Sequence, residues 1–191
     1  SGCGKTTLLY AIAGLIPTRE QEFIQPRPWE EMPPRIGSDR FPVWPEVVDE
    51  EGQAMQLPYQ IRSGQPYPIK ALLGFGMNYR MWPDSEGLRQ SLNMLDFFVN
   101  IDIFMTDTCK MADIVLPACT SLERSELRCY PMGYIIFTQP VIEPLYESRS
   151  DVDIIYQLAE KLGLEDELFA AGYETSIDYI LEPSGITVAE L

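Results

Sequence analysis

The 191-residue sequence contains no histidine, which excludes an imidazole base and removes the usual nitrogen ligand of zinc. Its four cysteines, Cys3, Cys109, Cys119 and Cys129, are widely spaced and form no C-x-x-C pair. A zinc site therefore cannot be assembled. We interpret the cysteines as buried, reduced thiols that pack like small apolar side chains.

Long hydrophobic runs and a secretory signal peptide are also lacking. No apolar run approaches the length of a membrane span, and no charged start followed by a short apolar stretch marks a signal peptide. We therefore expect a cytoplasmic protein without direct membrane insertion. Periplasmic export of a longer parent protein stays open as an alternative.

Basic side chains are scarce. The sequence has 14 Lys and Arg against 29 Asp and Glu, which gives a net charge of −15. Such a charge repels nucleic acid and anionic membranes, so we expect no nucleic-acid partner, although a local basic pocket for a phosphate remains compatible with it. What is present is a 46% hydrophobic share with 11% aromatics, which indicates a packed globular chain.

The chain divides into two regions by composition. Residues 1–40 contain an apolar helical pattern from Thr6 to Ile16, closed by Pro17, and then an irregular extension with stretches such as "PRPWEEMPP". Such a proline-rich stretch favours an extended connector. Residues 41–191 read as the folded domain. The first residue is Ser1 and "GITVAEL" ends at the start of a helical pattern, so we expect a fragment of a longer protein.

Helix and strand patterns alternate along the folded domain. We predict helices near 50–63, 85–96 and 151–162, strands near 69–75, 97–105 and 113–118, and a short helical turn near 106–112. This order predicts an α/β fold with a doubly wound, mostly parallel sheet. The stretch 123–151 is rich in β-branched and aromatic residues, and we expect it to cross the edge of that sheet.

The opening "SGCGKTTLLYAIAGL" ends like a phosphate-binding loop, with Gly4, Lys5 and Thr6 in the last positions of the motif and its first glycine missing. It resembles the phosphate loop of ABC transporter ATPases. That family also needs a signature loop of the S-G-G-Q type and a switch histidine, and neither is present. The segment is a working ATP site of a transporter component, a coincidental helix, or a joined or misread terminus, which we favour.

Three further stretches carry a more extensive resemblance: "PIKALLGFGMNYRMWPDS", "DFFVNIDIFMTDTCKMADIVLPACTSLER" and "ESRSDVDIIYQLAEKLG". In order and spacing they resemble the molybdopterin oxidoreductase family related to dimethyl sulfoxide reductase. The resemblance implies a Rossmann-like domain that holds one of two molybdopterin guanine dinucleotides with Mo or W. Ligands of parallel sheets sit at the carboxyl ends of the strands, where these loops fall.

Five residues match positions near the dinucleotide in that family: Asn78, Ile101, Asp102, Arg124 and Asp151. The Asn78 amide can bond guanine or phosphate, or the residue can serve a left-handed turn. Asp102 can accept from ribose hydroxyls or guanine N–H groups. Arg124 suits the pyrophosphate, or pairs with Glu123 or Glu126 on the surface. Asp151 can accept from guanine or cap the following helix.

The loops near these positions contain further polar residues and one departure from the family pattern. Thr106, Asp107 and Thr108 can present amides to an anion, but structural capping is the stronger interpretation. Cys109 stands where relatives often have alanine, which favours packing over redox chemistry. Tyr79 stands where the family often has proline, so the resemblance does not define the exact path of this loop.

The resemblance also implies what this chain does not supply. It predicts no catalytic residue and no metal ligand here, because the family's metal ligand and the cysteines of its 4Fe-4S cluster belong to segments absent from this sequence. The implied partners are the rest of the catalytic subunit and an iron–sulfur electron-transfer subunit. The rival interpretations are the ATP-binding transporter component and an α/β interaction module that binds no cofactor.

Overall fold

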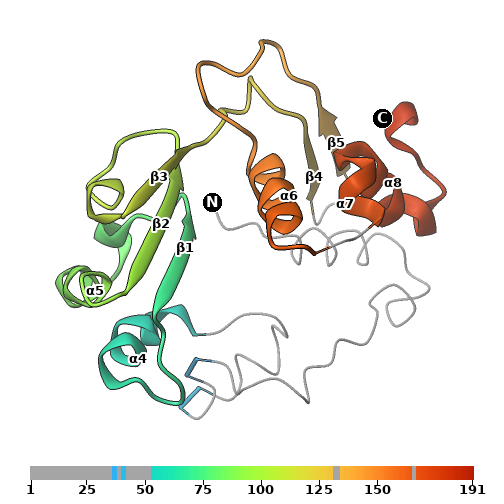
Figure 1. Ribbon diagram of the computed structural model, residues 1–191. Coiled ribbons are helices and arrows are strands. Elements are labelled where there is room, and N and C mark those ends of the chain that lie inside the picture. Colours follow the sequence, from blue (N-terminus) through green and yellow to red (C-terminus); the bar gives the residue numbers. More distant parts are fainter. Residues whose placement is uncertain (1–35, 38–39, 42–52, 131–133, 165–166) are drawn as a thin grey trace. The chain divides into compact units, whose positions relative to one another are not determined.

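The computed structural model describes residues 36–37, 40–41, 53–130, 134–164 and 167–191 (Figure 1). The predicted helix at 6–16 and most of the predicted connector lie outside the described residues and stay predictions. The predicted domain boundary between residues 40 and 41 also stays a prediction. The described part forms two compact units that meet in sequence between Leu116 and Pro117. Each unit is described by itself.

The first unit is an α/β structure built on a three-stranded parallel sheet in the order β1-β2-β3. Its α-helices are α4 (Leu57–Ser63) and α5 (Ser85–Leu92), and its strands are β1 (Ala71–Phe75), β2 (Phe97–Asp102) and β3 (Ile114–Pro117). Short 3-10 turns form η2 (Ala54–Gln56), η3 (Tyr79–Met81) and η4 (Cys109–Met111). The predicted succession of strands, helix and helical turn is confirmed. The strands lie in the sheet in the same order as in the chain. Both connections therefore lead to the next strand on the same side, whereas a doubly wound sheet also extends to the other side of its first strand.

Helix α5 connects β1 to β2 and covers the sheet with its apolar stripe. It begins at Ser85 after the cap residue Asp84, whose carboxylate accepts a hydrogen bond from Gly87 N at 2.9 Å and so satisfies one of the free N–H groups of the first turn. Leu88 and Leu92 are buried against Phe98 of β2. The helix ends four residues before the predicted Asp96, because Asp96 N already bonds Lys70 O at 2.8 Å and leads the chain into the sheet.

The second unit combines a hairpin with helices (Figure 1). Strands β4 (Glu126–Tyr130) and β5 (Tyr134–Thr138) pair in antiparallel fashion. They are followed by α6 (Asp151–Lys161), α7 (Glu167–Ala171), α8 (Tyr173–Leu181), η5 (Glu182–Ser184) and η6 (Val188–Glu190). Part of the stretch 123–151 thus forms a small antiparallel sheet of its own, which the sequence patterns did not predict. Its predicted crossing of the parallel sheet's edge stays a prediction.

The hairpin forms because it has its own apolar partner. Leu127 of β4 is buried in one cluster with Ile177 and Leu181 of α8, and Ile135 and Phe137 of β5 pack against that cluster. Alternating apolar residues on both strands can therefore bury one face against a helix. Within the described residues, no helix is both long and apolar enough to span a membrane.

Candidate functional site

The carboxyl ends of β1 and β2 lie side by side. The two strands pair in parallel, and the register puts Phe75 opposite Ile101. Directly after β1, Gly76 adopts φ 58 and donates its N–H to Ile101 O at 2.7 Å. This left-handed turn suits glycine, which lacks a Cβ. The loop that carries Asn78 therefore starts beside the end of the strand that carries Ile101 and Asp102.

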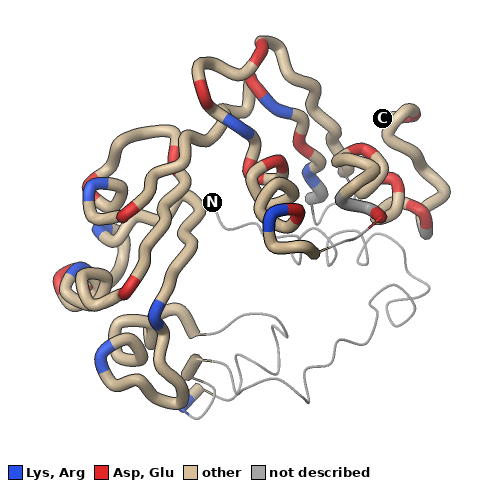
Figure 2. Tube along the Cα trace, in the orientation of Figure 1, with Lys and Arg blue, Asp and Glu red and all other residues tan. Residues whose placement is uncertain are grey.

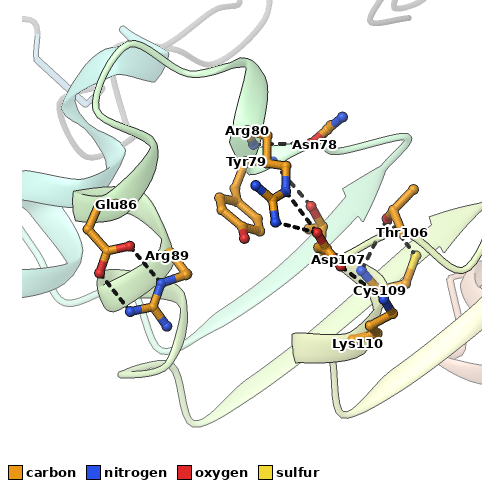
Figure 3. A network of polar contacts seen from close by, with 10 residues as sticks. Asn78, Tyr79, Arg80, Glu86, Arg89, Thr106, Asp107, Cys109 and Lys110 are labelled. Atoms are coloured by element: carbon orange, nitrogen blue, oxygen red, sulfur yellow. Dashed lines mark hydrogen bonds and ion pairs between the residues drawn. The ribbon is translucent and has the colours of Figure 1, made fainter.

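Asn78 caps the 3-10 turn η3 in an extended conformation, with φ −129. Its Oδ1 accepts a hydrogen bond from Arg80 N at 3.1 Å. The left-handed turn role that the sequence offered as an alternative is therefore wrong. Figure 3 shows the amide nitrogen of Asn78 pointing away from Arg80. This geometry leaves the NH₂ group of the side chain as a donor at the edge of the sheet.

Ile101 and Asp102 end β2 with different surroundings. The Ile101 side chain is 1% exposed and belongs to the core, while its carbonyl accepts from Gly76. Asp102 is half-buried, and its Oδ1 accepts from Phe104 N at 3.2 Å. Ile101 thus contributes through its backbone, and Asp102 presents a carboxylate at the strand end.

The loops that follow β1 and β2 are joined by a set of contacts that we call the loop clamp (Figure 3). Arg80 donates from Nε and Nη2 to Asp107 Oδ2 at 2.8 and 2.5 Å. Tyr79 N donates to Thr108 Oγ1 at 3.1 Å in a buried position. Lys110 Nζ lies 2.9 Å from Asp107 Oδ1. The hydrogen bonds from Lys110 and Arg80 lower the pKa of Asp107, which keeps its carboxylate charged.

The loop after β2 is also held by capping and by a buried sulfur. Thr106 Oγ1 accepts from Cys109 N at 3.3 Å, in agreement with the capping interpretation. Cys109 is 1% exposed and its Sγ accepts from Asn100 Nδ2 at 3.1 Å, so its packing role is confirmed. Asn100 is fully buried, and its Oδ1 has no hydrogen-bond partner among the described residues.

Asn100 and Arg80 are two residues that the sequence interpretation missed. A lone asparagine inside an apolar strand is the signal that points to Asn100, because a buried amide needs partners from neighbouring loops. Arg80 has no comparable signal, since its partner Asp107 lies 27 positions away. Cys119 is a buried free thiol too, and burial raises its pKa. The side chains of Cys3 and Cys129 lie outside the described part.

Arg124 and Asp151, predicted separately, pair with each other in the second unit. Arg124 Nη1 lies 3.2 Å from Asp151 Oδ2, and its Nη2 lies 3.6 Å from Glu126 Oε2. The helix cap of α6 is Ser150, which accepts from Asp153 N at 3.1 Å. The capping alternative for Asp151 is therefore wrong. Arg124 Nε is buried without a partner among the described residues.

Glu123 orders the turn before Arg124 and does not pair with it. Its Oε2 accepts from Thr120 N and Oγ1 at 2.7 and 2.6 Å, and its Oε1 accepts from Leu145 N at 2.7 Å. These hydrogen bonds, with that from the Thr120 hydroxyl as the largest cause, lower the pKa of Glu123 to about 2. Glu123 is thus a structural carboxylate that is 5% exposed.

The five predicted residues form two groups. Asn78, Ile101 and Asp102 meet at one edge of the sheet, whereas Arg124 and Asp151 belong to the second unit. In the first unit, Asn78 offers an amide donor and Asp102 a carboxylate acceptor, groups that suit guanine and ribose. In the second unit, Arg124 offers a guanidinium, a group that suits phosphate, and its buried Nε has no partner among the described residues. Asp and Glu recur along both units, with Lys and Arg interspersed among them (Figure 2). Among the described residues, no group of His, Cys, Asp or Glu can hold a metal ion.

Comparison with known proteins identifies the family of this chain. The molybdopterin oxidoreductase family model matches residues 51–161. The chain is 32% identical to trimethylamine-N-oxide reductase of Pasteurella multocida over 125 residues, 64% of this chain and 14% of that protein. It is 41% identical to the dimethyl sulfoxide/trimethylamine N-oxide reductase of Cereibacter sphaeroides over 83 residues, 42% of this chain and 10% of that protein.

A solved structure is also similar. Acetylene hydratase from Pelobacter acetylenicus shares 28% identity with a TM-score of 0.65, over 73% of this chain and 20% of that chain. The chain thus spans a small part of its relatives. The phosphate-loop-like segment at 1–16 lies outside both the family match and the described residues, so the transporter alternative stays a prediction. Since the family model covers more than half of the sequence, the chain belongs to the molybdopterin oxidoreductase family.

Proposed function

We propose that this chain is the part of a molybdenum or tungsten oxidoreductase that binds molybdopterin guanine dinucleotide. One observation carries the proposal: the parallel register of β1 and β2 brings Asn78 and Asp102 to the same carboxyl edge, which is where open α/β sheets bind nucleotides. When bound, the cofactor supplies redox chemistry at its metal, whose ligand lies elsewhere in the enzyme.

The residues of this edge have distinct roles in the proposal. The Asp102 carboxylate accepts hydrogen bonds from guanine N–H groups or ribose hydroxyls, and the free NH₂ of Asn78 donates to guanine or phosphate oxygens. The Ile101 backbone keeps the two loops in register through Gly76. In the second unit, we propose that the Arg124 guanidinium serves the pyrophosphate and that Asp151 orients Arg124 by their ion pair.

The proposal extends to the whole enzyme. We propose that the three described strands belong to a larger, doubly wound Rossmann-like sheet. Its partners are then the rest of the catalytic subunit, with a 4Fe-4S cluster bound outside this chain, and an iron–sulfur electron-transfer subunit. We propose a cytoplasmic location for the enzyme. We propose that it binds no nucleic acid and does not insert into a membrane.

The proposal can be tested by changing one carboxylate in the full-length enzyme. The Asp102→Asn variant is purified beside Asp96→Asn, a control at the amino end of the same strand. Asp96 is exposed, and its backbone N–H bonds Lys70 O. Pterin, GMP released by hydrolysis, and metal are measured per protein. We expect Asp102→Asn alone to lower all three; an enzyme that carries neither pterin nor metal would refute the proposal.

A further inference from the structure

The loop clamp joins two loops that the chain connects only through α5 and β2. Arg80 belongs to the loop after β1 and Asp107 to the loop after β2, and both nitrogens of the bidentate contact reach one carboxylate oxygen, at 2.8 and 2.5 Å. The side chains of Arg80 and Asp107 are 64% and 39% exposed. Exposed ion pairs contribute little to folding stability, so a role in stabilising the fold does not explain this two-nitrogen contact well.

A second, buried contact crosses between the same loops. Thr108 is fully buried, and its Oγ1 accepts the N–H of Tyr79 at 3.1 Å. A proline at position 79 could not make this bond, because it lacks the N–H. The clamp therefore combines a buried hydrogen bond with a charged contact above it.

We propose that the loop clamp is a positioning device that holds Asn78 and Asp102 at a fixed separation for the guanine nucleotide. Asn78 directly precedes the clamped pair Tyr79 and Arg80, and Asp102 begins the loop that leads to Asp107 and Thr108. Holding both loops in the bound geometry before the ligand arrives lowers the entropy lost on binding. This inference rests on the proposed function and adds Arg80 and Asp107 as positioning residues.

For the loss of Asp107, the loop clamp and simple electrostatics predict opposite changes in ligand affinity. Removing the negative charge of Asp107 near an anionic ligand should strengthen binding if only charge matters. If Asp107 acts through the clamp, its removal weakens binding instead. Lys110 supplies the matching control, because it contacts the same carboxylate as Arg80 does. Lys110 and Asp107 belong to the same loop, so their contact does not join the two loops.

The test measures GDP affinity by titration calorimetry for the full chain and its variants. We expect Arg80→Ala and Asp107→Ala each to raise the Kd for GDP about fivefold, with the double variant no weaker than either single one. Lys110→Ala, which removes the same charge as Arg80→Ala, should have a smaller effect. Arg89→Ala breaks a similar exposed pair within α5, Arg89 with Glu86 at 2.6 Å (Figure 3), and should leave the Kd unchanged.

The outcomes separate the two proposals. If the wild-type chain binds GDP and Asp107→Ala binds it equally or more tightly, the clamp has no positioning role while the proposed function stands. If Arg80→Ala and Lys110→Ala weaken binding equally, charge alone explains the effect and the clamp is again refuted. If the wild-type chain does not bind GDP, the proposed function fails and the clamp inference with it. Thermal unfolding of each variant confirms that its Kd refers to folded protein.

Discussion

Arg124 Nη1 lies 3.2 Å from Asp151 Oδ2, so two residues assigned separately to a dinucleotide are partners of each other. The contact ties the segment before β4 to the first turn of α6. Because Glu126 Oε2 lies near the same guanidinium at 3.6 Å, Arg124 has two carboxylate neighbours while its buried Nε stays unused. Arg124 is thus held by carboxylates from two elements of the second unit, β4 and α6.

The first prediction concerns this ion pair. Asp151→Asn should lower the free energy of unfolding by about 0.5 to 1 kcal/mol, because the Asp151 side chain is 38% exposed and that of Arg124 is 22% exposed. The loss should shrink at high salt, where the pair is screened. Urea unfolding at low and high ionic strength measures it. Glu160→Gln, at an exposed position of the same helix, serves as the control; an equal loss there would show a general charge effect.

Sequence patterns predicted the elements whose causes are local. Helices near 85–96 and 151–162 were predicted because the residues that form and cap α5 and α6 lie close together in the sequence. The choice between neighbouring cap residues needed the structure, since Ser150 and not Asp151 caps α6. The parallel pairing of β1 and β2 followed from their order in the chain. From these features the sequence predicts that Asn78 and Asp102 lie at the same edge of the sheet, at the carboxyl ends of β1 and β2.

The remaining features depend on contacts between distant residues. The β4–β5 hairpin was missed because its stability comes from packing on α8, about fifty positions later. The loop clamp pairs Arg80 with Asp107 across a helix and a strand, and no local pattern marks a charge that will find such a partner. The partnership of Arg124 with Asp151 was hidden for the same reason.

The second prediction is a pH dependence caused by Glu123. Its pKa falls from an ordinary 4.5 to about 2 in the folded chain, so its contribution to stability is complete above pH 4.5 and is lost as the pH falls towards 2. Glu123→Gln removes this contribution. The difference in unfolding free energy between wild type and variant should therefore be largest near neutral pH and shrink below pH 4.5. Urea unfolding across this range tests it; a constant difference would contradict the assignment.

The third prediction concerns the buried contact of the loop clamp. Thr108→Val keeps the shape of the side chain but removes the oxygen that accepts from Tyr79 N. A buried N–H left without a partner should cost about 1 to 3 kcal/mol of unfolding free energy. Chemical denaturation measures the loss. Thr175→Val, at an exposed position of α8, is the matched control and should change stability by about 0.5 kcal/mol at most; equal losses would mean that the Tyr79 bond contributes nothing special.

The fourth prediction concerns the close approach of Gly74 to Asn100, which face each other across β1 and β2. A Cβ on Gly74 would lie 2.6 Å from Asn100 Oδ1 and 3.1 Å from Met77 Cβ. Gly74→Ala should therefore lower the free energy of unfolding by about 1 to 3 kcal/mol. The strain falls first on the Asn100 amide, which is also bonded to Cys109.

In an Asn100→Ala background, Gly74→Ala should lower the free energy of unfolding by less, because the nearer obstacle is gone. A double-mutant cycle by urea unfolding measures this coupling, and equal costs in both backgrounds would show that Asn100 is not what requires glycine at position 74.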